Sequence, residues 1–113
     1  MPGVSIHVVD VSRGVVAAGM KVELSKDGRR IAGGAISAKG LLEDAALDTT
    51  FAPGHYEAVF HVADYYRVAG IPLPATPFLD VVTYRFGIDD PKQHYHLPFK
   101  MTPWGYSCFR GGA

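Results

Sequence analysis

The chain has 113 residues, and eleven Lys or Arg balance eleven Asp or Glu, which gives a formal net charge of zero at pH 7. This balance argues against a nucleic-acid partner, which needs a basic face to neutralise phosphates, and it provides no polybasic attraction to a membrane surface. The length suits one domain over residues 1–113, and thirteen glycines with eight prolines favour short strands joined by turns.

The N-terminus, Met1-Pro2-Gly3, leads into a strand pattern without a basic segment, a long apolar region or a cleavage site. We therefore expect a cytoplasmic location, and no apolar run is long enough to cross a bilayer. The single cysteine, Cys108, excludes an intrachain disulfide and a multi-cysteine metal site.

The first forty residues predict three strands, and an extended segment follows from Leu41. The strands cover residues 4–11, 20–24 and 29–36. In the first strand, alternation places His7 on the less apolar face. Lys26-Asp27-Gly28 is a hairpin signal between the second and third strands.

The second half predicts one short helix, over residues 63–69, with Gly70 as its C-terminal stop. Further strands are expected over residues 55–63, 78–88, 94–101 and 104–110. About eight short strands with one helical turn indicate an all-β fold, an antiparallel β-sandwich with Greek-key-like connections.

The run from Gln93 to Phe99 contains two histidines on a strand pattern. Alternation places His94 and His96 on one face, opposite an apolar face. Such a strand has a core side and a chemical side, and the strand that contains His7 has the same pattern. A His-Tyr-His run is also common on solvated strands, so the pattern alone does not establish a site.

Three parts of the chain carry a family resemblance. They are Ile6-His7-Val8-Val9-Asp10; Gly54-His55-Tyr56-Glu57-Ala58-Val59-Phe60 with Asp64-Tyr65-Tyr66; and His94-Tyr95-His96-Leu97-Pro98 with Pro103-Trp104-Gly105-Tyr106-Ser107. They resemble the transthyretin-like family, in its 5-hydroxyisourate hydrolase branch, which acts in urate degradation. The resemblance extends from Val4 to Gly112 and implies the transthyretin-like sandwich.

The resemblance also implies an activity, an assembly and a set of site residues. The family enzymes hydrolyse a ring amide without metal or cofactor, in homotetramers whose sites lie between dimers. Carried over by position, His7 and His96 form the catalytic pair that supplies the general base and the general acid. Arg110 and Gly111 fall in the substrate-binding set, and His94, on the His96 face, fits a supporting or interface position.

Three positions depart from the family pattern. Leu41 stands where the family has an arginine, Phe109 replaces a tyrosine, and Gly112 replaces a serine. Losing one charged contact typically costs about 2–4 kcal/mol of transition-state stabilisation. An apolar Leu41 would better suit an N-methylated or less polar heterocycle, and Phe109 and Leu41 are therefore counted among the substrate contacts.

Other readings of the reactive side chains are less well supported. Three histidines on neighbouring strands could in principle hold zinc, but no ligand-spacing signature is present, and we expect no metal or cofactor. Ser107 and Cys108 are alternative nucleophiles, although a buried, inert thiol is the simpler interpretation of Cys108. His55 and His61 are interpreted as structural. Lys39, Arg29 or Arg30 could replace the missing arginine, although a solvated turn or strand residue is the simpler interpretation of each.

Three hypotheses remain open. The first is a homotetrameric hydrolase similar to 5-hydroxyisourate hydrolase, acting on a cyclic ureide or lactam. The second is a family member that acts on a different or N-methylated small heterocycle. The third is a non-catalytic small-molecule binder. The retained histidines count against the third hypothesis. The departures at Leu41, Phe109 and Gly112 count against the first hypothesis in its simple form.

Overall fold

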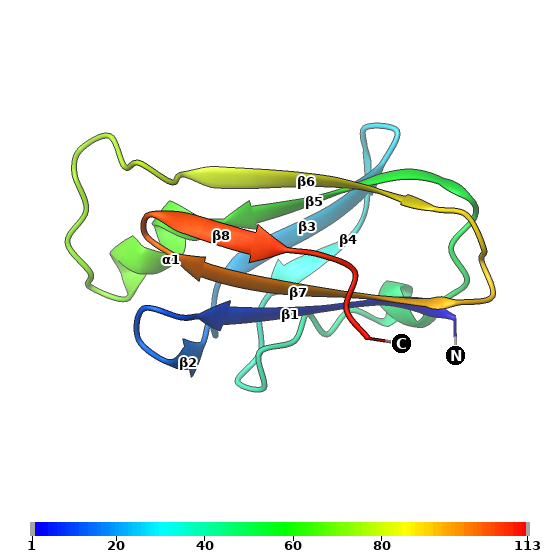
Figure 1. Cartoon of the computed structure of the whole chain (residues 1–113), viewed down its shortest axis with the longest axis horizontal. Helices are drawn as coiled ribbons and strands as arrows, with labels where there is room; N and C mark the ends of the chain where they lie inside the picture. Colours follow the sequence, from blue (N-terminus) through cyan, green and yellow to red (C-terminus); the bar gives the residue numbers. More distant parts are fainter. Residues whose placement is uncertain (1, 113) are drawn as a thin grey trace.

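The computed structural model of the chain describes residues 2–112, which form two four-stranded sheets packed face to face (Figure 1). One sheet has the order β2-β1-β7-β8 and the other β4-β3-β5-β6. The strands are β1 (Gly3–Asp10), β2 (Val15–Val16), β3 (Lys21–Lys26), β4 (Arg29–Ala35), β5 (Gly54–His61), β6 (Val81–Ile88), β7 (His94–Thr102) and β8 (Gly105–Cys108). The helical segments are the 3-10 helix η1 (Ala45–Asp48) and α1 (Val62–Val68).

The predicted sandwich with one short helix is confirmed. Helix α1 begins one residue earlier than expected, and Gly70, with a φ of 80°, ends it as predicted. The β3–β4 hairpin turns at Asp27 and Gly28, whose φ values of 52° and 77° are those of a type I′ turn. Strand β6 begins at Val81 rather than at Phe78, whose side chain is 76% exposed in the proline-rich loop.

One strand pair differs from the antiparallel expectation. Strands β1 and β7 run parallel, with Gly3–Asp10 paired against His94–Met101, whereas the other strand pairs are antiparallel. Two parallel strands need a long connection between them, and here the chain from the end of β1 to the start of β7 forms this connection. Both ends of the chain therefore contribute neighbouring strands to the same sheet.

The core forms between the inner faces of the two sheets. On β1 and β7 the inward side chains are almost fully buried; they include Val4, Ile6, Val8, Tyr95, Leu97 and Phe99. Phe99 stacks on Phe60 of the opposite sheet with ring centroids 3.9 Å apart. Because successive side chains alternate, the positions between these inward residues face outward, including His7, His94 and His96. None of the helical segments in residues 2–112 has the length and apolar character that a bilayer crossing requires.

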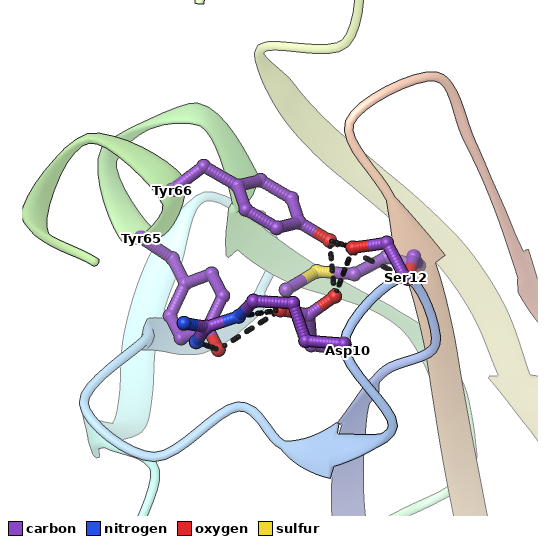
Figure 2. Close-up of polar contacts among 6 residues, drawn as sticks. Asp10, Ser12, Tyr65 and Tyr66 are labelled. Atoms are coloured by element: carbon purple, nitrogen blue, oxygen red, sulfur yellow. Dashed lines mark hydrogen bonds and ion pairs between the residues drawn. The ribbon is translucent and has the colours of Figure 1, made fainter. Parts of the chain in front are cut away.

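A buried carboxylate fixes the end of β1 (Figure 2). Asp10 is fully buried, and its oxygens accept hydrogen bonds from Ser12 Oγ (2.6 Å), Tyr66 OH (2.7 Å), Arg13 Nε (2.9 Å) and Tyr65 OH (3.2 Å). The tyrosines belong to α1 and the other donors to the turn after β1, so one carboxylate joins strand, turn and helix.

Burial raises the pKa of the Asp10 carboxyl, but the hydrogen bonds from Ser12, Arg13, Tyr66 and Tyr65 together lower it by more. The net pKa lies below the usual value for aspartate. This carboxylate therefore stabilises the fold above the pKa it has in the unfolded chain, and the contribution is lost as the pH falls through its folded value.

We predict that Asp10→Asn lowers the free energy of unfolding by about 3 kcal/mol, because an amide cannot accept from donors on both sides. Urea denaturation at pH 7 measures this difference, which should shrink as the pH falls below about 4. Asp64→Asn is the matched control, since the ion pair of Asp64 with Arg67 is exposed and contributes little. Equal stability of the two variants would show that the Asp10 carboxylate does not stabilise the fold.

Candidate active site

The histidines gather on the outer face of the sheet because β1 and β7 are neighbours. In the register of the pair, Ser5 lies opposite His96, and His7 lies opposite Pro98. Side chains at these outward positions of neighbouring strands are within contact distance of one another. The two histidine-bearing strands, which the sequence places at opposite ends of the chain, thus contribute to one surface.

Ser5 connects two of the histidines. Its Oγ atom lies 2.6 Å from Nδ1 of His96 and 2.8 Å from Nε2 of His94. Alternation along β1 places Ser5 on the same face as His7, but Ser5 was not among the predicted site residues. A strand serine carries no further signal, and only the pairing with β7 gives it two imidazole partners.

Glycines define the space around the two predicted catalytic imidazoles. A Cβ atom on Gly111 would lie 2.7 Å from Cδ2 of His96, and one on Gly40 would lie 2.7 Å from Nε2 of His7. The Gly111 N–H also donates to the His96 carbonyl at 2.7 Å, which holds the C-terminal tail against β7. Leu41 forms an isolated antiparallel bridge with His7, so the substituted position borders that imidazole.

The environment of His96 favours its neutral form. Burial lowers the pKa of His96, and the neighbouring imidazoles of His7 and His94 lower it further because a second positive charge would be repelled. A neutral imidazole has one nitrogen that donates and one that accepts. At neutral pH, His96 can therefore exchange a proton with a bound molecule.

Arg110 and Phe109 lie at the border of this group of histidines. The Arg110 Nη2 atom donates to Gln93 Oε1 (2.7 Å) and to the His94 carbonyl (3.2 Å), and its guanidinium stacks on Tyr95 at 4.2 Å. Within residues 2–112 it makes no hydrogen bond to the side chains of His7 or His96. The Phe109 ring lies 5.9 Å from Nζ of Lys100.

Lys100 is a cation that the sequence analysis missed. It follows His96 and Pro98 on the outward face of β7 and pairs in register with Val9, which makes it a diagonal neighbour of His7. The same alternation that assigns His94 and His96 to one face assigns Lys100 to it, so the signal was present. The alternative cations Arg29 and Arg30 lie on β4 of the other sheet, and Lys39 lies in the turn before Gly40.

A hollow of about 420 Å³ opens beside Ser5 and Leu41, and the other residues that line it come from β1, η1 and the segment before η1. Its size falls in the range of small-molecule pockets, and its rim includes the carboxylates of Glu43, Asp44 and Asp48. A small heterocycle that approaches Ser5 and Leu41 from this side would therefore meet both apolar and acidic surface.

The remaining reactive side chains lie elsewhere or are inert. His61 pairs with Glu23 at 2.7 Å on the other sheet, and His55 also belongs to β5. Burial raises the pKa of the Cys108 thiol to about 11, so a thiolate nucleophile is scarce at neutral pH. Across the described part of the chain, no group of three or more His, Cys, Asp or Glu side chains is arranged to hold a metal ion.

Two known proteins match this chain over nearly its whole length. The 5-hydroxyisourate hydrolase of Deinococcus radiodurans is 43% identical over 115 aligned residues, which cover 97% of this chain and 96% of that protein. The 5-hydroxyisourate hydrolase 2 of Rhizobium meliloti is 40% identical and covers 93% of this chain and 92% of its own length.

Solved structures agree with these relatives. Klebsiella pneumoniae 5-hydroxyisourate hydrolase superimposes with a TM-score of 0.82 at 27% identity, over 99% of this chain and all of that one. (S)-allantoin synthase superimposes with a TM-score of 0.87 at 32% identity, over 97% of this chain but only 43% of its own. A model of the HIUase/Transthyretin family matches residues 4–111, and the chain therefore belongs to that family.

Proposed function

We propose that the protein is a hydrolase that opens the ring amide of 5-hydroxyisourate in urate degradation. The observation that carries the proposal is the pair of outward imidazoles, His7 and His96, on adjacent parallel strands. Their neighbours Ser5 and Leu41 line a small hollow. The names of relatives that match nearly the full chain support the same substrate. No cofactor enters the reaction.

In the proposed reaction, water attacks the ring carbonyl and the carbon–nitrogen bond then breaks. The His7–His96 pair takes the proton of the attacking water and returns a proton to the leaving nitrogen, so the base and acid roles both fall to these imidazoles. Lys100 and Arg110 provide positive charge for the oxyanion and for the substrate's anionic oxygens. Gly111, Phe109 and His94 complete the proposed substrate-binding set.

We also propose a cytoplasmic homotetramer with its sites between dimers. The outer edges of β6 and β8 are unpaired in the described residues, and Tyr84 of β6 is near Tyr106 and Cys108 of β8. Two open edges on one side of the sandwich suit pairing with a second copy. The outward histidine face would then be covered by the other dimer, which would exclude water from the reaction.

A second candidate function is hydrolysis of an N-methylated or otherwise less polar ring. Leu41 favours it, because this side chain borders His7 in place of a family arginine. An apolar wall loses a charge-assisted contact with an anionic ring but removes no proton-transfer group. The two candidate functions therefore share the imidazole pair and differ in their preferred substrate.

We predict that the protein accelerates the ultraviolet decay of freshly generated 5-hydroxyisourate, and that His7→Ala or His96→Ala reduces this acceleration by about 10²- to 10⁴-fold. His55→Ala is the control, since His55 lies on the other sheet. Decay no faster than in buffer would exclude this substrate. Turnover of an N-methylated analogue alone would favour the second candidate function, and binding without turnover would favour a small-molecule binder.

We predict that Gly111→Ala reduces kcat by about a hundredfold, because the new methyl group would displace the His96 ring. Gly112→Ala is the matched control, since no described atom outside the adjacent residues lies within 4 Å of a Cβ added there. Steady-state kinetics with thermal unfolding of both variants distinguish displacement of the imidazole from loss of the fold. Equal kcat values would show that Gly111 does not position His96.

We predict a particle of about four times the 12.2 kDa chain mass in sedimentation equilibrium at micromolar concentration. A tetramer follows if both open edges and the histidine face are covered by other copies. A monomer that retains full turnover would show that one chain contains the complete site.

A further inference from the structure

We infer that Ser5 is a positioning residue that sets the protonation pattern of the histidines, so that His96 presents an Nε2–H donor to the substrate. This inference rests on the proposed function for its meaning, but its geometric basis is independent of the substrate. It makes His96 a hydrogen-bond donor to the substrate and leaves the proton transfers to His7, a division of roles that the sequence does not settle.

The Ser5 hydroxyl has a single hydrogen to share between two imidazole neighbours. Its oxygen lies within hydrogen-bond distance of two imidazole nitrogens, at 2.6 Å from His96 and 2.8 Å from His94. A hydroxyl donates one hydrogen bond and can accept others. If both contacts are hydrogen bonds and both rings are neutral, Ser5 donates to one ring and accepts from the other.

The other ring nitrogen of His94 indicates where the proton of this ring lies. Its Nδ1 atom is buried and has no hydrogen-bond partner among residues 2–112. An orphaned buried N–H is rarer than an acceptor left without a donor. The proton of His94 therefore belongs on Nε2, where it is donated to Ser5 Oγ.

The direction of the hydrogen bond between His94 and Ser5 determines the direction of the one between Ser5 and His96. Because Ser5 accepts from His94, its own hydrogen is donated to Nδ1 of His96. The neutral His96 ring then carries its proton on Nε2. That atom has no hydrogen-bond partner within the described residues and is not among the buried polar atoms, so it is free to donate to a ligand.

The environment of His96 agrees with a neutral donor. Burial and the neighbouring imidazoles of His7 and His94 lower the pKa of His96, so the ring stays neutral near pH 7. A neutral imidazole N–H can donate a hydrogen bond that polarises a carbonyl oxygen. In the reaction proposed above, the Nε2–H of His96 would donate to the carbonyl oxygen as negative charge develops there, while His7 accepts the proton from water and returns it to the ring nitrogen as the carbon–nitrogen bond breaks.

The assignment also gives a role to His94. Within the described residues, the Ser5 hydroxyl is the sole hydrogen-bond partner of its ring. The ring is a fixed donor that prevents the hydroxyl from turning. Removal of either His94 or Ser5 should therefore have the same effect on the tautomer of His96.

Long-range proton–nitrogen NMR of the histidine rings tests the inference directly, at a pH where the rings are neutral. We expect the wild-type His96 proton on Nε2, and a mixture of tautomers in Ser5→Ala and in His94→Phe. Ser5→Thr keeps the hydroxyl and should keep the wild-type pattern. Ser25→Ala, on β3 of the other sheet, is the matched control.

Kinetics give a second readout. We expect Ser5→Ala to lower kcat by about 10- to 100-fold, the range seen when a group that orients a histidine is removed. KM should change less, and the Ser5→Ala/His94→Phe double variant should be no slower than either single variant. Full additivity in this double-mutant cycle would overturn the coupling.

The two proposals fail in different ways. A wild-type His96 proton on Nδ1, or a tautomer unchanged by Ser5→Ala, would overturn the role of Ser5 whatever the activity. The expected tautomers together with no turnover of 5-hydroxyisourate would refute the proposed substrate and leave the role of Ser5 standing.

Discussion

The position of β1 decides the geometry of the candidate site, and the buried carboxylate of Asp10 fixes where β1 ends. A charge in the core is costly unless donors surround it, and the turn and helix α1 supply four of them. Since β1 is continuous from this clamp to Ser5, a shift by one residue would turn the imidazole of His7 into the core. The clamp thus links a stabilising interaction of the interior to chemistry on the surface.

The outer face of the same sheet carries three imidazoles, with Lys100 and the Arg110 guanidinium at its border. The proximity of the rings has an electrostatic consequence, because His7 and His94 disfavour a charge on His96. A site of this kind handles protons through neutral donors and acceptors. Its chemistry then depends on which nitrogen carries each hydrogen, and a small hydroxyl such as that of Ser5 can determine the outcome.

Much of this structure follows from alternation along the sequence, because the buried face of a strand has apolar residues at every second position. That rule identified the inward faces of β1 and β7 and the outward direction of His7, His94 and His96. It does not reveal which strands are neighbours, so the parallel pairing of β1 with β7 and the role of Ser5 were not predictable. The two-residue strand β2 and the helix η1 are too short to carry a period. The direction of Arg110 depends on Gln93 and Tyr95, and no local pattern encodes such contacts.

The pairing of the first strand with the penultimate one also has a consequence for how the molecule forms. Gly3 pairs with His94, so closing this contact requires nearly the whole chain to be ordered or at least collapsed. Contacts of such long sequence separation slow folding, because loop-closure entropy is lost before the contact is gained. During synthesis, β1 leaves the ribosome before β7 and must wait for it, with an unpaired edge and an apolar face exposed in the meantime. Folding of this chain is therefore expected to depend on how quickly synthesis reaches β7.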